Sequence, residues 1–158
     1  MRLKRLKPYA LWILLVEAIG FLASLLTRRG TEQFNELAAK PPLTPPEVVF
    51  PIVWGILYAL MGISAARVWL AAESKERSRG LNLFVIQLVL NVFWTLIFFN
   101  AAAYGLASVW IVALWAAVLL MTLQFFKVDR LAAWLQVPYL LWLTFAAYLN
   151  FGVWVVNM

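Results

Sequence analysis

The sequence contains neither cysteine nor histidine among its 158 residues. Without cysteine the chain cannot form disulfides, use a thiolate nucleophile or hold a sulfur-ligated cluster. The absence of histidine removes the side chain that most often serves as a general base and as a metal or haem ligand. Hydrolytic, metal-dependent and haem-ligated chemistry are therefore not expected.

Charge is also scarce, because only 13% of the residues are charged, against about a quarter in soluble domains. Residues 80–126 contain no charged side chain. As one helix this stretch would be roughly 70 Å long, whereas the hydrocarbon core of a bilayer is only about 30 Å thick. We therefore expect the chain to fold back within residues 100–105, where polar residues and a glycine interrupt the apolar pattern.

Hydrophobic residues make up 65% of the chain and aromatic residues 16%. The hydropathy predicts one integral membrane domain over residues 1–158, an all-α bundle of five transmembrane helices. The expected spans are residues 8–27, 47–72, 81–99, 106–126 and 130–156. The one long connection, residues 28–46, contains Pro41-Pro42 and Pro45-Pro46, so its second half should be extended and stiff. Such a loop suits either a lid over a cavity or a plain connector.

The formal net charge of +6 comes from Lys and Arg residues that lie beside the apolar spans, mainly at residues 2–7 and 67–79. Positions next to a membrane are where basic residues set topology, so this distribution argues against nucleic-acid binding. The bias toward one side predicts a cytoplasmic N-terminus in a multi-pass protein of a bacterial inner membrane.

Polar and aromatic side chains share one face on three of the predicted spans. The stripes consist of Phe50, Trp54, Tyr58 and Met61; of Gln87, Asn91, Trp94 and Phe98; and of Tyr139, Trp142, Ala146, Asn150 and Asn157. Because unpaired polar groups are costly in hydrocarbon, these faces should point into the bundle. They favour either interhelical hydrogen bonds and interfacial aromatic belts, or a cavity for a large, flat, mostly apolar ligand.

Glu17 is the only acidic residue well inside a predicted span. No cationic partner within the membrane is evident for it. An intramembrane carboxylate is a functional candidate by default, so Glu17 is kept as one.

Three segments together resemble one known family. They are residues 40–62 (KPPLTPPEVVFPIVWGILYALMG), 87–99 (QLVLNVFWTLIFF) and 138–150 (PYLLWLTFAAYLN). In this order, within residues 34–157, they resemble the TspO family, the tryptophan-rich sensory proteins of bacteria that are related to the mitochondrial translocator protein (peripheral benzodiazepine receptor). The chain departs from many relatives at Leu43 and at Gln33-Phe34, where those have tryptophan and a Trp-Tyr pair.

The resemblance implies a five-helix bundle in the lipid bilayer, commonly a homodimer, that binds porphyrins such as protoporphyrin IX and requires no cofactor. Some members also bind sterols and benzodiazepine-type ligands. The family's ligand residues correspond to Pro45, Trp54, Asn91, Trp94, Trp142 and Ala146. Combined with the stripes, the candidate ligand-binding residues are Pro45, Phe50, Trp54, Tyr58, Gln87, Asn91, Trp94, Phe98, Tyr139, Trp142, Ala146 and Asn150.

Three functions fit this reading. The first is a porphyrin-binding sensor or regulator. The second is an enzyme that degrades porphyrin with light and oxygen, for which Trp54 and Trp142 are the candidate catalytic residues. The third is a small transporter of porphyrin or lipid.

Overall fold

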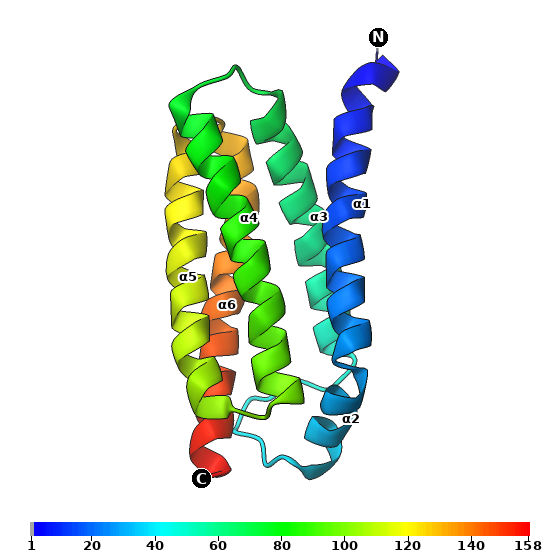
Figure 1. Cartoon of the computed structure of the whole chain (residues 1–158), viewed down its shortest axis with the longest axis vertical. Helices are drawn as coiled ribbons and strands as arrows, with labels where there is room; N and C mark the ends of the chain where they lie inside the picture. The colour runs from blue at the N-terminus through cyan, green and yellow to red at the C-terminus, as the bar shows by residue number, and fades with distance from the viewer. Residues whose placement is uncertain (1) are drawn as a thin grey trace.

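The structure is a computed structural model that describes residues 2–158. Five long helices stand side by side, and a short helix lies across one end (Figure 1). The helices are α1 (Arg2–Leu26), α2 (Arg28–Leu37), α3 (Val49–Leu70), α4 (Lys75–Thr95), the π-helical turn η1 (Leu96–Asn100), α5 (Tyr104–Phe126) and α6 (Arg130–Val156). The five helices expected from hydropathy are confirmed, since α1, α3, α4 with η1, α5 and α6 are long and apolar enough to cross a membrane.

Neighbouring helices pack in the pairs α1–α3, α3–α6, α4–α5 and α5–α6. The N-terminus, the α3–α4 turn and the α5–α6 turn lie at one end of the bundle, called here the N-terminal end (Figure 1). The C-terminus, α2 and the α4–α5 turn lie at the opposite end, called the α2 end. The predicted turn within residues 100–105 is confirmed, because η1 ends at Asn100 and α5 begins at Tyr104.

The loop predicted over residues 28–46 is wrong in its first half, where the chain forms α2. Phe34 anchors this helix, its ring centre 5.1 Å from that of Phe98 and 5.5 Å from that of Phe99. Gly30 allows the close approach, because a Cβ there would lie only 2.5 Å from the Phe99 carbonyl oxygen. Tertiary packing therefore forms a helix in a segment too polar to be recognised by hydropathy.

Two side chains cap helices at the N-terminal end. The Ser74 hydroxyl accepts from the Arg77 amide at 3.1 Å and starts α4 earlier than residue 81, the predicted start of that span. Asp129 caps α6 by accepting from the Ala132 amide at 2.8 Å. The Asp129 carboxylate also receives two hydrogen bonds from the Arg67 guanidinium, at 3.1 and 3.0 Å, which joins α3 to the start of α6.

The same contacts perturb the acidity of Asp129. Partial burial of the carboxyl raises its pKa, but the hydrogen bonds from Arg67 and from the Ala132 amide outweigh it, so the pKa of Asp129 is lowered. The carboxylate is therefore the favoured form in the folded bundle.

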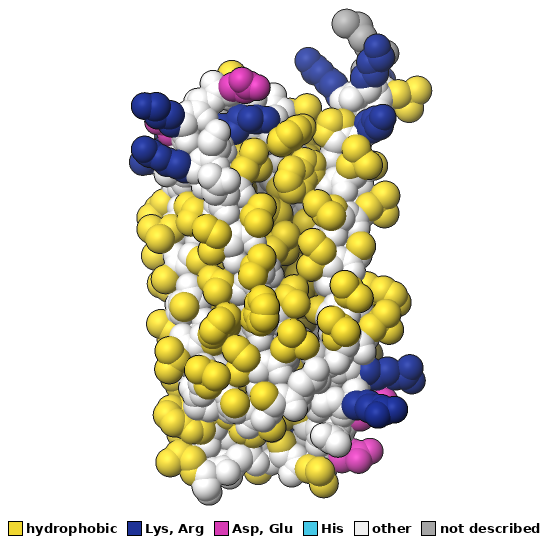
Figure 2. Space-filling view, in the orientation of Figure 1, with side chains coloured by type: hydrophobic (Ala, Val, Ile, Leu, Met, Phe, Trp, Pro, Cys, Tyr) yellow, Lys and Arg dark blue, Asp and Glu magenta, His cyan; other side chains and the backbone are white. Residues whose placement is uncertain are grey.

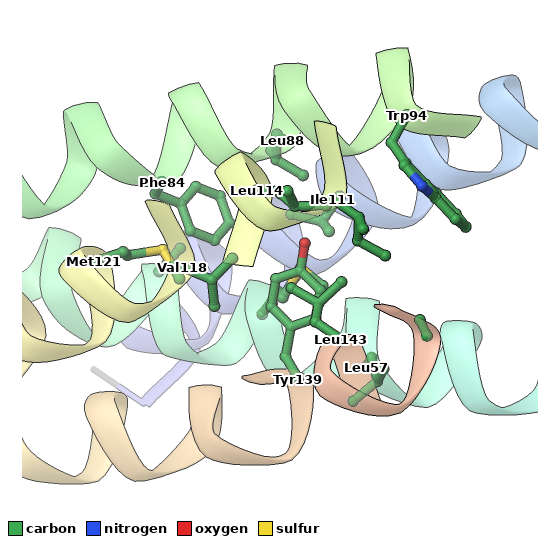
Figure 3. Packing of buried hydrophobic residues seen from close by; sticks show 14 of the residues in the cluster. Leu57, Phe84, Leu88, Trp94, Ile111, Leu114, Val118, Met121, Tyr139 and Leu143 are labelled. Atoms are coloured by element: carbon green, nitrogen blue, oxygen red, sulfur yellow. The ribbon is translucent and has the colours of Figure 1, made fainter. Parts of the chain in front are cut away.

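The half of the bundle nearer the N-terminal end is filled by apolar side chains. Phe84, Val118 and Met121 lie close together in Figure 3, and all three are fully buried. Gly80 packs against the ring of Phe125, where a Cβ would lie 3.0 Å from the ring atoms. The packing at these positions is close.

The outside of the bundle is apolar along its length. Figure 2 shows hydrophobic side chains covering this face between the two ends, with Lys and Arg gathered at the ends. Exposed leucine, valine and phenylalanine side chains, such as Leu14, Phe21 and Val109, belong to this band. A band of this kind suits contact with lipid chains, flanked by charged groups at the two membrane surfaces.

Candidate functional site

The half of the bundle nearer the α2 end contains a cavity of about 600 Å³. It lies between α1, α3, α4 with η1 and α6, and α2 with the following loop borders its open side. Eight of the predicted ligand-binding residues line it, namely Phe50, Trp54, Tyr58, Trp94, Phe98, Trp142, Ala146 and Asn150. The structure thus brings together most of the three stripes predicted from helical spacing.

Two aromatic walls face this cavity. On the α3–α6 side, the Trp142 ring packs edge-on against Phe50 at 6.0 Å and Trp54 at 6.5 Å between ring centres. On the α4 side, Trp94 and Phe98 stack with ring centres 5.3 Å apart. Aromatic faces and edges of this kind suit a flat ring system.

Hydrogen bonds fix the α4 wall. The Trp94 indole N–H donates to the Asn150 Oδ1 at 2.8 Å. The Asn150 amide nitrogen in turn donates to the Ser108 hydroxyl at 2.8 Å and to the Tyr104 carbonyl at 3.0 Å. Because each buried polar atom has a partner, the Trp94 ring keeps one orientation across α4, α5 and α6.

Three other predicted residues lie behind the wall rather than on it. Tyr58, which lines the cavity, donates to Asn91 Oδ1 at a long 3.4 Å. The Asn91 amide nitrogen donates to the Tyr139 hydroxyl at 2.8 Å, and Tyr139 donates to Gln87 Oε1 at 2.8 Å. These bonds place Gln87, Asn91 and Tyr139 in one buried network that supports Tyr58 from α4 and α6. Their contact with a ligand stays a prediction.

Trp142 differs from Trp94 in having a free polar atom. Within residues 2–158, its indole nitrogen is buried and has no hydrogen-bond partner. A buried N–H without an acceptor costs free energy unless another molecule supplies one. The Trp142 ring lines the cavity, but its buried nitrogen has no surface exposed to that space, so this donor reaches an acceptor on a ligand only when the ring turns.

The loop over residues 38–48 borders the opening of the cavity at the α2 end. It is held to the last turns of α6, because the Asn157 side-chain amide exchanges two hydrogen bonds with Ala39, at 3.0 and 2.9 Å. The Tyr148 hydroxyl donates to the Pro42 carbonyl at 2.8 Å. Asn157, on the predicted α6 stripe, therefore fastens the loop and does not line the cavity. Pro45 belongs to the same loop without lining the cavity, so a direct role for it stays a prediction.

Sequence reasoning missed the contribution of α1 and α2 to the cavity. Gly20 and Ser24 of α1 and Thr27, between α1 and α2, line one side. Thr31, Phe34 and Asn35 of α2 line the opening. The signal in α1 was the run of small residues at helical spacing, which leaves space beside Tyr58. A Cβ at Gly20 would overlap the Tyr58 ring.

Glu17 lies one turn before Gly20 on α1. Ile13, one turn before Glu17, touches Gly62 of α3, and Gly20 touches Tyr58 of α3. Helical spacing therefore turns Glu17 toward α3, beyond the inner end of the cavity. Among residues 2–158 Glu17 forms no ion pair.

Together these features define a class of protein, a five-helix membrane bundle with a tryptophan-lined cavity bordered by a fastened loop. A sequence profile described as the TspO/MBR family matches residues 12–155 of the chain. The chain belongs to this family, which confirms the resemblance seen in the sequence.

Individual relatives agree with the family assignment. The chain is 39% identical over 155 residues to the "Tryptophan-rich protein TspO" of Chlorobaculum tepidum, covering 98% of both chains. It is 41% identical over 119 residues to "Protein CrtK" of Rhodobacter capsulatus, covering 75% of this chain and 74% of the relative. It is 34% identical over 140 residues to the "Translocator protein" of Bos taurus, covering 87% and 83%. With five apolar helices and these relatives, the chain is an integral, multi-pass membrane protein.

Proposed function

We propose that the protein binds a tetrapyrrole of the protoporphyrin IX type in the tryptophan-lined cavity and acts as a membrane sensor or regulator. The observation that carries this proposal is the combination of two facing aromatic walls with the unpartnered Trp142 indole N–H. The walls suit the faces of a large flat ring, and a turn of the Trp142 side chain would bring its N–H to an acceptor on that ring.

The size of the cavity supports the same proposal. Its volume of about 600 Å³ falls within the range of about 300–1,000 Å³ typical of ligand pockets. Indole and phenyl groups dominate its inner part, while the side chains of Thr31, Asn35 and Thr44 border its opening. A ligand that is apolar in the middle and polar at one edge matches this distribution.

A sensor must change when its ligand binds, and the fastened loop offers the means. Loop residues Thr44, Glu47 and Val48 line the cavity together with Trp142 of α6. A ligand in the cavity would therefore touch the loop and the helix that holds it. We expect occupancy to slow amide hydrogen exchange over residues 38–48, a change that a partner at the membrane surface can recognise.

The test is a titration of the detergent-solubilised protein with protoporphyrin IX in the dark, followed by tryptophan emission. The Trp142→Phe variant keeps an aromatic ring and removes the N–H, so its Kd should rise about fivefold, for the loss of about 1 kcal/mol of hydrogen bonding. The Trp134→Phe variant is the matched control on the same helix, because Trp134 is 60% exposed on the outside of the bundle. Its Kd should equal that of the unmodified protein.

Two outcomes would contradict the proposal. Quenching that never saturates would mean that the porphyrin partitions into the detergent micelle. Saturable quenching with the same Kd in all three proteins would place the ligand outside the tryptophan-lined cavity.

A further inference from the structure

The opening of the cavity carries two charged groups of opposite sign. The Lys40 ammonium nitrogen lies 3.0 Å from the Asn35 carbonyl oxygen and 5.4 Å from the centre of the Phe34 ring. Since Phe34 and Asn35 line the cavity, these two contacts hold the positive charge at its α2 edge. The carboxylate belongs to Glu47, which itself lines the cavity just before α3 begins.

Neither charge is neutralised by the protein. The ion pairs found within residues 2–158 are Arg28–Glu32 and Arg67–Asp129, and neither includes Lys40 or Glu47. An ammonium group has three N–H donors, and the Asn35 carbonyl occupies one of them. Lys40 therefore has donors and charge to offer to an anionic group at the edge of the cavity.

The interior of the cavity cannot take such an anionic group. Its walls are formed by Trp54, Trp94, Phe98 and Trp142, and an ionised carboxylate among them would lose its hydration without gaining a cation. The carboxylates of a bound ligand must therefore stay at the opening.

We propose that Lys40 binds the carboxylate edge of the ligand and that Glu47 repels it. The charge pair would then orient a flat aromatic ring with its acidic side toward α2 and the opposite side toward the inner end of the cavity. This inference rests on the proposed function and refines it, because it makes the cavity selective for rings that carry carboxylates on one edge.

The test compares protoporphyrin IX, which carries two carboxylates, with its dimethyl ester, which carries none. A partly exposed ion pair is worth up to about 1 kcal/mol, or about fivefold in Kd. Lys40→Gln should therefore weaken binding of the acid about fivefold, and Lys40→Arg should preserve it. Glu47→Gln should strengthen binding of the acid about twofold by removing repulsion. The Kd of the ester should stay the same in every variant.

Two variants control for the general charge of this end. Arg29 and Glu36 are exposed residues of α2 that do not line the cavity. Arg29→Gln and Glu36→Gln change the net charge by the same amounts as the two test substitutions. Their Kd values for both porphyrins should match those of the unmodified protein. In the unmodified protein, 1 M salt should remove most of the electrostatic contribution that makes the acid bind more tightly than the ester.

Three results would overturn the inference. If Lys40→Gln weakens acid and ester equally, Lys40 acts by holding Phe34 and the loop rather than by binding a carboxylate. If Arg29→Gln weakens the acid as much as Lys40→Gln does, the general surface potential is responsible. If neither porphyrin binds saturably and Trp142→Phe changes nothing, the proposed function itself fails and this inference with it.

Discussion

The two halves of the bundle use aromatic residues in different ways. Near the N-terminal end, Phe84 and Phe125 are fully buried and fill the space between helices. Near the α2 end, Trp54 and Trp142 stand beside a cavity and leave it open. The same type of side chain therefore serves as packing in one half and as a binding wall in the other.

The difference arises from what holds each ring in place. Phe125 packs directly against Gly80, so close contact between helices fixes it. Trp94 instead depends on its hydrogen bond to Asn150, and Tyr58 is supported by the network through Asn91 and Tyr139. Hydrogen bonds to indole and phenol groups let an aromatic wall keep its shape without filling the space before it.

The largest expected effect comes from emptying the filled half. Phe125→Ala should destabilise the protein by about 2 kcal/mol. Moving an apolar ring between lipid and the bundle interior changes the free energy little, but the cavity left by the ring removes packing contacts. Trp54→Ala, which only enlarges an existing cavity, should cost less than about 1 kcal/mol and abolish saturable porphyrin binding. Unfolding in mixed detergent micelles measures the first effect, and the titration in the dark measures the second. Equal losses of stability would show that the two halves do not differ.

Two glycines of α3 sharpen the comparison at the level of helix contacts. A Cβ at Gly62 would lie 2.6 Å from the Ile13 Cα, whereas a Cβ at Gly55 meets nothing within 4 Å. Gly62→Ala should therefore push α1 away and cost about 1–2 kcal/mol. Gly55→Ala should stabilise the protein by about 0.5–1 kcal/mol, since alanine favours the helix. Unfolding midpoints of the two variants should lie on opposite sides of that of the unmodified protein. Midpoints lowered alike would contradict the close α1–α3 contact.

The sequence allowed much of the bundle to be predicted. Long, mainly apolar runs predicted the five spans, and the turn between Asn100 and Tyr104 was visible as a break in the apolar pattern. Helical spacing also grouped the side chains that turn inward, including Trp94, Tyr139 and Asn150, which are all buried. These features follow from the helical repeat and from hydropathy, both of which can be determined from the local sequence of a membrane-spanning chain.

The features that the sequence did not predict depend on how the helices are rotated about their axes and on how far each residue lies from the membrane centre. Gln87 and Trp94 share one stripe, yet Gln87 belongs to the buried network and Trp94 to the cavity wall. No spacing rule separates the two, because only contacts with α6 decide which one is covered. The helix α2 was missed for the same reason, since its stability comes from Phe34 packing on η1.

The smallest expected effect separates the two ends of the bundle by their response to acid. The Arg67–Asp129 pair joins helices at the N-terminal end, whereas the neutral Asn157–Ala39 contacts hold the loop at the α2 end. Asp129→Asn should cost about 1 kcal/mol at pH 7, for one partly exposed, charge-assisted contact. Asn157→Ala should cost about 0.5–1 kcal/mol, for hydrogen bonds between neutral groups at an exposed site.

The pH dependence distinguishes these two variants. Because the pKa of Asp129 is lowered in the folded protein, its stabilising contribution is complete above the unfolded pKa of about 3.9 and is lost as the pH falls through the folded value. The difference in unfolding midpoint between Asp129→Asn and the unmodified protein should therefore shrink between pH 5 and about pH 2. The difference for Asn157→Ala should stay constant over that range, since neither Asn157 nor the Ala39 backbone titrates. A constant difference for Asp129→Asn would mean that ionisation of the carboxylate is not what stabilises this end, and no difference at any pH would mean that an amide replaces the carboxylate as the helix cap.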